Sequence, residues 1–226
     1  MVSRTLFAIN AGLLWFGVVL STILSATDYY PPDLSSPSLY GNNAVGTGGM
    51  TGRLLDHFSY FTTLSNIVAA LVVTILIFRP TSTSPVLRVL RLDSVIMMTV
   101  TGLIFNLLLN SGTHTGADWW SNSIQHVWGP IVTVAVWLIA GPHGWIRSST
   151  IFAALILPLA WLVYALVRGS VTGAYPYNFL DVPVKGMASV LSFVAVLVVF
   201  AIVLGYIMMA VDAVIDRRYR RVGACP

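Results

Sequence analysis

The sequence has little charge. Only 9% of its 226 residues are charged, 57% are hydrophobic, and glutamate is absent. A soluble domain carries charge on about a quarter of its residues to cover its surface. This composition therefore excludes an ordinary soluble enzyme and a disordered chain. The net charge of +4 comes from small arginine clusters beside apolar runs, so it indicates no nucleic-acid partner.

Cysteine is equally scarce. The single one, Cys225, lies next to the C-terminal residue. It excludes an internal disulfide, a cysteine-based zinc site and an iron–sulfur cluster.

Long apolar runs, in contrast, are abundant. A transmembrane helix needs about 20 mostly apolar residues. Six stretches qualify: 5–25, 57–78, 94–110, 123–140, 150–167 and 187–211. None contains Asp, Glu, Lys or Arg, and the first is longer than the apolar core of a signal peptide. The sequence predicts an all-α polytopic membrane protein, residues 1–226, with one domain of six transmembrane helices.

The loop charges predict an orientation. The two ends and the second and fourth loops carry nine arginines: Arg4, Arg79, Arg88, Arg91, Arg147, Arg217, Arg218, Arg220 and Arg221. The other three loops hold only Arg53, Arg168 and Lys185. Because positive charge is retained on the cytoplasmic side, we expect both termini inside a bacterial plasma (inner) membrane. The long loop 26–56 is then outside, and its length is typical of a functional lid or a disordered segment.

Polar residues inside spans are costly and therefore informative. Three pairs are spaced by four positions, which places each pair on one helix face: Thr62 and Asn66, Asn106 and Asn110, and Asn122 and His126. The predicted topology puts all three near the outer ends of their spans. The inner halves carry nothing comparable, and we expect His143, between Pro142 and Gly144, in a solvated turn.

Three chemistries fit this cluster. A threonine hydroxyl becomes a nucleophile when a histidine takes its proton, and Thr62 and His126 are the one pair at similar depth. His57, His114 and His126, with Asp56, offer a weaker metal site, because no HxxxH spacing occurs. The third possibility is a non-catalytic lipid-binding or scaffold protein that uses the same pocket. A transporter has little support, since no internal repeat and no intramembrane charge is found.

Three segments carry a family resemblance. They read FSYFTTLSN at 58–66, NSIQH at 122–126 followed by Pro130, and GSVTGAYPYNFLD at 169–181, in which YPYNFLD at 175–181 is the most specific part. With the six-span layout, they resemble the membrane family of the androgen-induced and androgen-dependent TFPI-regulating proteins, which has many bacterial relatives. The first loop is longer than in the animal proteins. Val136 stands where many bacterial relatives have an Asp, and Pro130 lies one residue closer to His126 than in the animal form.

The resemblance implies a threonine hydrolase acting within the membrane. Animal members hydrolyse fatty acid esters of hydroxy fatty acids; a bacterial relative need not keep that substrate. Thr62 matches the family's threonine and His126 its histidine. We expect a cavity lined by Thr62, Asn66, Asn106, Asn110 and His126, which receives a lipid ester from the membrane and needs no cofactor.

The segment 168–181 would form the rim of that cavity. There Arg168 would hold a lipid carboxylate or phosphate, or would be an interfacial arginine whose charged end reaches the head-group level; Tyr175 is a further candidate for substrate binding. Asp181 is expected to cap a loop rather than act as a catalytic acid. The oligomeric state and the acyl specificity stay open.

Overall fold

The computed structural model describes residues 2–32, 34–82, 84–109 and 114–223. It is 80% helical, and the described residues form no strand. Six segments are long and apolar enough to cross a membrane: Val2–Ala26, Phe61–Phe78, Pro85–Leu109, Gly116–Ala140, Ser148–Thr172 and Met187–Tyr219. The predicted all-α fold with six membrane-spanning segments is confirmed.

Several spans are divided into shorter helices. In chain order the elements are α1 (Val2–Ala26), η1 (Thr47–Gly49), α2 (Met50–Ser59), α3 (Phe61–Phe78), α4 (Pro85–Ile104), η2 (Phe105–Leu109), α5 (Gly116–Ser123), η3 (Ile124–Trp128), α6 (Gly129–Ala140), α7 (Ser148–Ala154), α8 (Ile156–Thr172), η4 (Asn178–Leu180), α9 (Val182–Lys185) and α10 (Met187–Gly223). Of these, η2 and η3 are π-helical turns, and η1 and η4 are 3₁₀ turns.

The helices extend beyond most of the predicted spans. Arg91 and Asp93 lie in α4, Arg168 in α8 and Asp212 in α10, so the expectation that the spanning helices carry no charge is wrong. The apolar runs marked only the part of each helix without charges. His57 is also outside the second spanning helix, because the chain breaks at Tyr60 and His57 belongs to α2.

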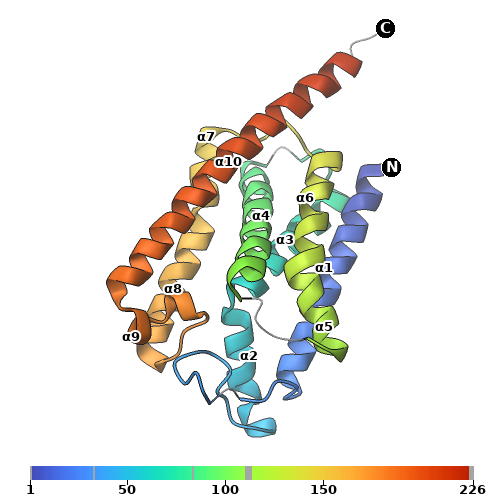
Figure 1. The fold of residues 1–226 in the computed structure, drawn as a ribbon. Coiled ribbons are helices and arrows are strands. Elements are labelled where there is room, and N and C mark those ends of the chain that lie inside the picture. Colours follow the sequence, from blue (N-terminus) through green and yellow to red (C-terminus); the bar gives the residue numbers. More distant parts are fainter. Residues whose placement is uncertain (1, 33, 83, 110–113, 224–226) are drawn as a thin grey trace.

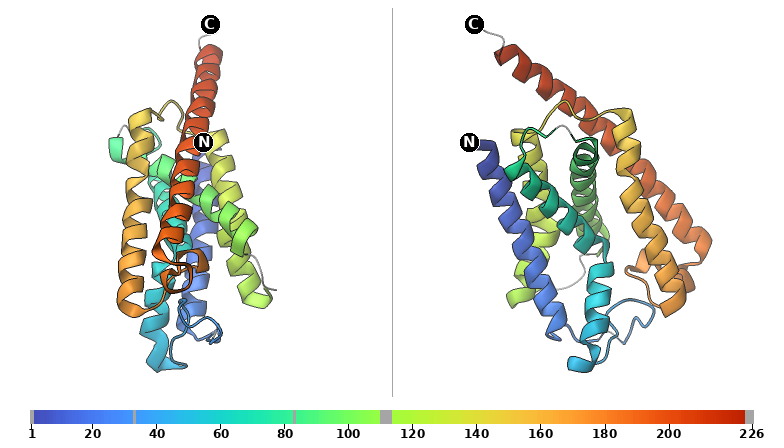
Figure 2. Two further views of the ribbon diagram at one scale, coloured as in Figure 1. Left: turned by 60° about the vertical axis from the view of Figure 1, so that its left-hand side comes forward. Right: turned by 180° about the vertical axis from the view of Figure 1, so that it is seen from behind.

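The core lies among four helices. α1 packs on α3 and α6, and α4 packs on the same two helices (Figure 1). Buried side chains such as Phe7, Leu14, Val73 and Met98 fill the space between them. The α7–α8 segment and α10 stand to one side of this group (Figure 2). The outer face of α10 exposes apolar side chains such as Val203, as a lipid-facing helix does.

Both chain ends lie at one end of the bundle, together with the loops that follow α3 and α6 (Figure 1). The loop after α1, helix α2 and the α8–α10 connection lie at the opposite end. An even number of crossings requires this arrangement. The loop-charge prediction of which end is cytoplasmic stays a prediction.

The loop between α1 and α2 is folded where the structure describes it. The guanidinium of Arg53 is 8% exposed and forms an ion pair with Asp28, 3.1 Å away. It also donates hydrogen bonds to four backbone carbonyl oxygens, those of Ser25, Ala26, Ala44 and Gly46. A buried cation with this many partners holds the loop against the ends of α1 and α2.

The end of the bundle that holds the termini contains buried polar groups that the sequence did not indicate. His143 is not in a solvated turn: its side chain is 7% exposed and its Nδ1 lies 3.2 Å from Asp212 of α10. The expectation failed because α10 continues past the apolar run and covers this turn. Nearby, the buried Arg91 donates a hydrogen bond to the carbonyl oxygen of Gly141, 3.1 Å away.

Candidate active site

Thr62 lies in the first turn of α3. The extended backbone of Tyr60 (φ −70°, ψ 139°) separates α2 from α3, so the first amides of α3 have no acceptor within the helix. The Thr62 N–H instead donates to the hydroxyl oxygen of Tyr177, 3.2 Å away. The Thr62 hydroxyl is therefore held at a helix N-terminus, where the helix dipole favours developing negative charge.

The imidazole of His126 faces this hydroxyl. Its Nε2 lies 3.3 Å from Oγ1 of Thr62, and its Nδ1 lies 3.1 Å from the carbonyl oxygen of Asn122. A carbonyl oxygen can only accept, so the hydrogen bond requires the proton on Nδ1. In the neutral ring Nε2 then carries a lone pair aimed at the threonine hydroxyl. The ring of Phe105 stacks on the imidazole, with 3.8 Å between centroids, and restricts its rotation.

The histidine is carried by the π-helical turn η3, just before Pro130. In this turn the Gly129 N–H bonds the carbonyl oxygen of Ile124, which leaves the carbonyl oxygen of Gln125 without its usual helical donor. Pro130 has no N–H to donate to the carbonyl oxygen of His126. Both carbonyl groups need another donor.

Two asparagines supply these donors. The side-chain nitrogen of Asn66 lies 3.3 Å from the Gln125 carbonyl oxygen and 2.9 Å from that of Thr62. The side-chain nitrogen of Asn106 lies 3.3 Å from the His126 carbonyl oxygen. Both amides therefore support the backbone beneath the two reactive side chains. The structure thus brings Asn66 and Asn106 to Thr62 and His126, but the expectation that these two asparagines line the cavity is wrong, because both turn to backbone carbonyls instead.

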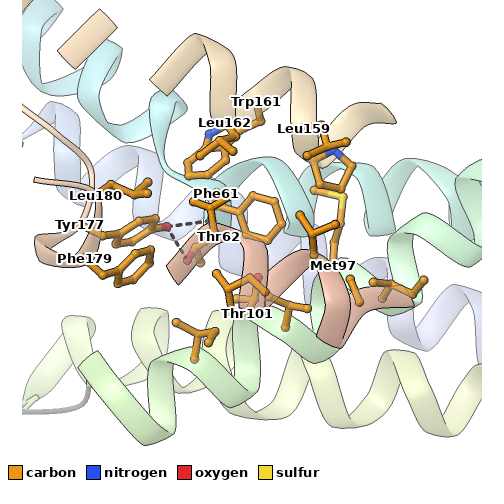
Figure 3. Close-up of a pocket in the computed structure, with 18 of the residues that line it drawn as sticks. Phe61, Thr62, Met97, Thr101, Leu159, Trp161, Leu162, Tyr177, Phe179 and Leu180 are labelled. Atoms are coloured by element: carbon orange, nitrogen blue, oxygen red, sulfur yellow. Dashed lines mark hydrogen bonds between the residues drawn. The ribbon is translucent and has the colours of Figure 1, made fainter. Parts of the chain in front are cut away.

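Tyr177 completes the site. Besides accepting from the Thr62 N–H, its hydroxyl lies 3.4 Å from Oγ1 of Thr62 (Figure 3). Burial raises the pKa of the Tyr177 hydroxyl, so it stays protonated and can donate a hydrogen bond. The hydroxyls of Tyr177 and Thr62 and the Nε2 of His126 then form one chain of hydrogen bonds.

Two cavities meet at this chain. The first has a volume of about 110 Å³ and lies among α3, α4, α8 and α10. Its wall is apolar apart from Thr62, Thr101 and the polar atoms of Tyr177 and Trp161 (Figure 3). The second, which we call the polar chamber, has a volume of about 480 Å³ and lies at the end of the bundle that holds α2. Thr62 and Tyr177 line both cavities, whereas His126 lines only the polar chamber.

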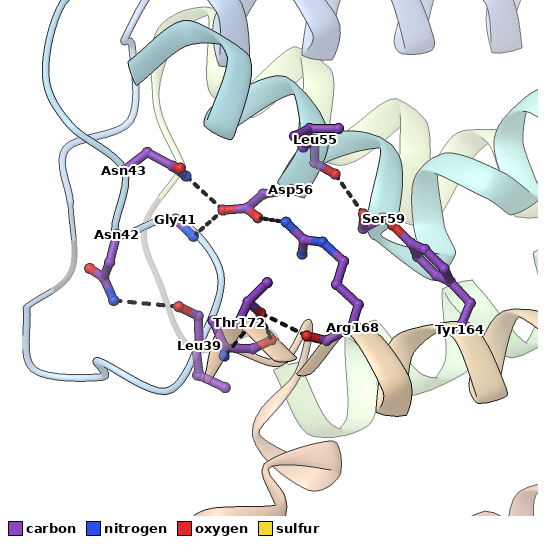
Figure 4. Close-up of polar contacts among 11 residues, drawn as sticks. Leu39, Gly41, Asn42, Asn43, Leu55, Asp56, Ser59, Tyr164, Arg168 and Thr172 are labelled. Atoms are coloured by element: carbon purple, nitrogen blue, oxygen red, sulfur yellow. Dashed lines mark hydrogen bonds and ion pairs between the residues drawn. The ribbon is translucent and has the colours of Figure 1, made fainter. Parts of the chain in front are cut away.

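The rim residues are paired with one another. Arg168 of α8 forms an ion pair of 2.6 Å with Asp56 of α2, and its guanidinium lies 4.2 Å from the centroid of the Tyr40 ring. The second carboxylate oxygen of Asp56 accepts from the backbone of Gly41 and the side chain of Asn43 (Figure 4). Arg168 therefore joins the first loop to α8, rather than facing the chamber as a free cation.

Tyr175 and Asp181 hold the segment that carries Tyr177. The backbone of Tyr175 pairs with that of Leu39, and its ring packs so closely on Gly169 that a Cβ there would lie 2.2 Å from a ring carbon. Asp181 accepts from the Ser38 hydroxyl at 2.5 Å and caps α9 through the Val184 N–H, as the expectation of a capping role required. Neither residue lines either of the two cavities described above.

The three histidines of the alternative metal site have separate partners. His57 bonds Thr22 through Nε2 at 3.2 Å, His114 lies 2.6 Å from Asp118, and His126 faces Thr62. Among the described residues, no group of three His, Cys, Asp or Glu side chains could hold a metal ion. The predicted site residue Asn110 lies outside the described residues.

Two contributors were not assigned a role from the sequence. Tyr177 lies in the quoted YPYNFLD segment, and Phe105 gives no signal beyond its place in an apolar run. The spacing of polar residues could not reveal either, because both reach the site through tertiary packing. Compared with protein-family models, curated proteins and solved structures, the chain has no match.

Proposed function

We propose that this six-helix membrane protein is a threonine hydrolase of lipid esters, with Thr62 as nucleophile and His126 as general base. The observation that carries the proposal is the 3.3 Å contact between Oγ1 of Thr62 and Nε2 of His126. It is supported by the partner of Nδ1, which leaves Nε2 free to take a proton. No cofactor takes part in this mechanism.

The reaction has two halves. In the first, Oγ1 of Thr62 attacks the ester carbonyl carbon while its proton passes to Nε2 of His126. The carbonyl electron pair moves to the oxygen, which the Tyr177 hydroxyl and the first amides of α3 stabilise. The tetrahedral intermediate then collapses, the bond to the alcohol oxygen breaks, and His126 returns the proton to the departing alcohol.

The second half releases the acid. A water molecule from the polar chamber gives its proton to His126 and attacks the acyl-threonine carbonyl carbon. The bond to Oγ1 then breaks, and Oγ1 recovers a proton from His126. The sum is ester plus water to carboxylic acid plus alcohol, and the enzyme is unchanged.

The two cavities support a lipid substrate. An acyl chain is compatible with the apolar cavity beside α8 and α10, whereas the ester group would lie at Thr62. The polar chamber, on the other side of Thr62, has room for a head group and water. A substrate already dissolved in the bilayer could reach this arrangement without entering water.

The location follows from the loop charges. We place the chain in the plasma membrane of a bacterium, with both termini cytoplasmic and the polar chamber near the outer leaflet. The resemblance of the three segments that carry Thr62, His126 and Tyr177 supports membership in the androgen-induced protein family. Membrane lipids are then the expected partners.

The test is labelling of the detergent-purified protein with a fluorophosphonate, followed by mass spectrometry. We expect a covalent adduct on Thr62, which Thr62→Ala and His126→Ala both abolish. Hydrolysis of a panel of lipid esters should fall by at least about 10³-fold in both variants. Thr99→Ala is the matched control, because the Thr99 hydroxyl only bonds the carbonyl oxygen of Val95 in its own helix. A folded wild type that is neither labelled nor active on any ester would instead indicate a lipid-binding or scaffold protein.

A further inference from the structure

The polar chamber has charged residues in its wall, and each of them has hydrogen-bond or ion-pair partners within the protein. Among the described residues that line it, only Arg53, Asp56 and Asp118 carry a formal charge. The partners of these three residues determine what kind of head group the chamber can hold.

Arg53 has no hydrogen-bond donor left for a ligand. A guanidinium has five N–H groups. Nε donates to one carbonyl oxygen, Nη1 contacts one carbonyl oxygen and Asp28, and Nη2 donates to two further carbonyl oxygens. These five contacts equal the number of donors, so an anion in the chamber would find no free N–H on Arg53.

The two carboxylates are occupied as well. Asp56 pairs with Arg168 through one oxygen and accepts two loop hydrogen bonds through the other (Figure 4). Asp118 accepts from the Tyr30 hydroxyl at 3.0 Å through one oxygen, and its other oxygen lies 2.6 Å from Nδ1 of His114. Each oxygen of the two carboxylates therefore already has a partner in the protein.

The polar groups that remain are uncharged. The side chains of Ser25, Tyr60, Thr63 and Asn122 line the chamber and form no hydrogen bond with another described residue. His57 adds a hydrogen-bond acceptor. The hydroxyls of Ser21 and Thr22 both donate their protons to the carbonyl oxygen of Val18, so toward His57 they can only accept, and Nε2 is the donor. Nδ1 of the neutral ring therefore keeps its lone pair. Burial lowers the pKa of His57 to about 4, which keeps the ring neutral.

We propose that the polar chamber binds an uncharged head group that carries hydroxyls, so that the substrate is an acylglycerol or an acylated sugar rather than a phospholipid or an ester with a free carboxylate. A hydroxyl both donates and accepts, and it can satisfy the free hydroxyls, amide and imidazole of this wall. A buried anion without a cation is costly. This proposal rests on the proposed hydrolase for its turnover test.

The turnover test uses matched pairs with one acyl chain. The first pair is oleoylglycerol and oleoyl lysophosphatidic acid; the second is the oleoyl ester of hydroxystearic acid as its methyl ester and as the free acid. We expect kcat/KM to be at least about tenfold higher for the uncharged member of each pair. Equal or faster turnover of the charged members would overturn the head-group proposal and leave the hydrolase intact.

A binding test separates the two proposals. The Thr62→Ala variant is titrated with two ethers that cannot be hydrolysed, hexadecylglycerol and hexadecyl phosphate. The glycerol ether should bind at least about tenfold more tightly, even if no ester is ever turned over. Equal binding, or tighter binding of the phosphate, overturns the assignment of the chamber.

A charge-insertion variant provides the positive control. Ser25→Lys puts an uncompensated cation in the chamber wall, while its backbone carbonyl still accepts from Arg53. We expect the preference for the uncharged ligand to shrink or reverse in this variant. An unchanged preference would show that selection does not occur in this chamber.

Discussion

The side-chain amide of Asn106 donates a hydrogen bond to the backbone carbonyl oxygen of His126, 3.3 Å away. That carbonyl has lost its usual helical donor, because Pro130 has no N–H. The amide therefore supports the turn on which the imidazole is mounted. Asn106 acts through the position of His126, without touching the reacting atoms.

Replacing Asn106 should thus impair turnover more than binding. In Asn106→Asp the side chain keeps its size but loses its N–H donors, so the turn that carries His126 can shift. We expect kcat to fall about 10-fold to 10²-fold with little change in KM. Ester hydrolysis by purified variants measures both constants. Ser192→Ala, which removes only a hydroxyl bonded within α10, should behave as wild type; an active Asn106→Asp would contradict the positioning role.

The Tyr177 hydroxyl has a different role, since it lies beside the reacting oxygen. Tyr177→Phe removes the hydroxyl but keeps a ring that can stack on Phe179, 5.1 Å away between centroids. Loss of one oxyanion donor costs about 10²-fold to 10³-fold in kcat. We expect that loss at nearly constant KM, and a fluorophosphonate adduct on Thr62 that forms more slowly.

The control for this prediction is Tyr206→Phe on the exposed face of α10, which should leave kcat unchanged. If Tyr177→Phe keeps full kcat, the hydroxyl is not an oxyanion donor, and the first amides of α3 must serve alone.

The six spans could be predicted because they depend on a local rule, whereas the 3.3 Å contact between Thr62 and His126 joins two helices and depends on tertiary packing. Apolar length marks a membrane helix, and a spacing of four puts side chains on one face. The roles of Asn66 and Asn106 could not be predicted, since each bonds a backbone carbonyl that lacks its usual helical donor. The carbonyl of Gln125 lacks its donor because of the π-helical turn, and that of His126 because Pro130 has no N–H. Tyr177 was missed for a similar reason: the position of its segment is set by the backbone pairing of Tyr175 with Leu39, a residue far away in the sequence. His143 was mispredicted because burial by α10 has no local signature.

Arg53 should contribute strongly to the stability of the loop between α1 and α2. In Arg53→Lys one ammonium with three donors replaces a planar group with five, so at least two carbonyl oxygens lose their partner. We expect the free energy of unfolding to fall by about 3 kcal/mol. Thermal unfolding in detergent measures this, and limited proteolysis should cut the segment 26–56 faster than in wild type. Arg147→Lys, an exposed charge at the other end of the bundle, is the matched control.

His57 should make stability depend on pH in the acid range. Burial lowers its pKa from the ordinary 6.5 to about 4, so the unfolded chain binds a proton more readily than the folded one. The stability that depends on the neutral ring is therefore fully present above pH 6.5 and is lost as the pH falls toward about 4. His57→Gln keeps a polar side chain but cannot titrate. Its unfolding temperature should drop less than that of wild type between about pH 7.5 and about pH 5. Parallel losses in the two proteins would show that another group causes the acid sensitivity.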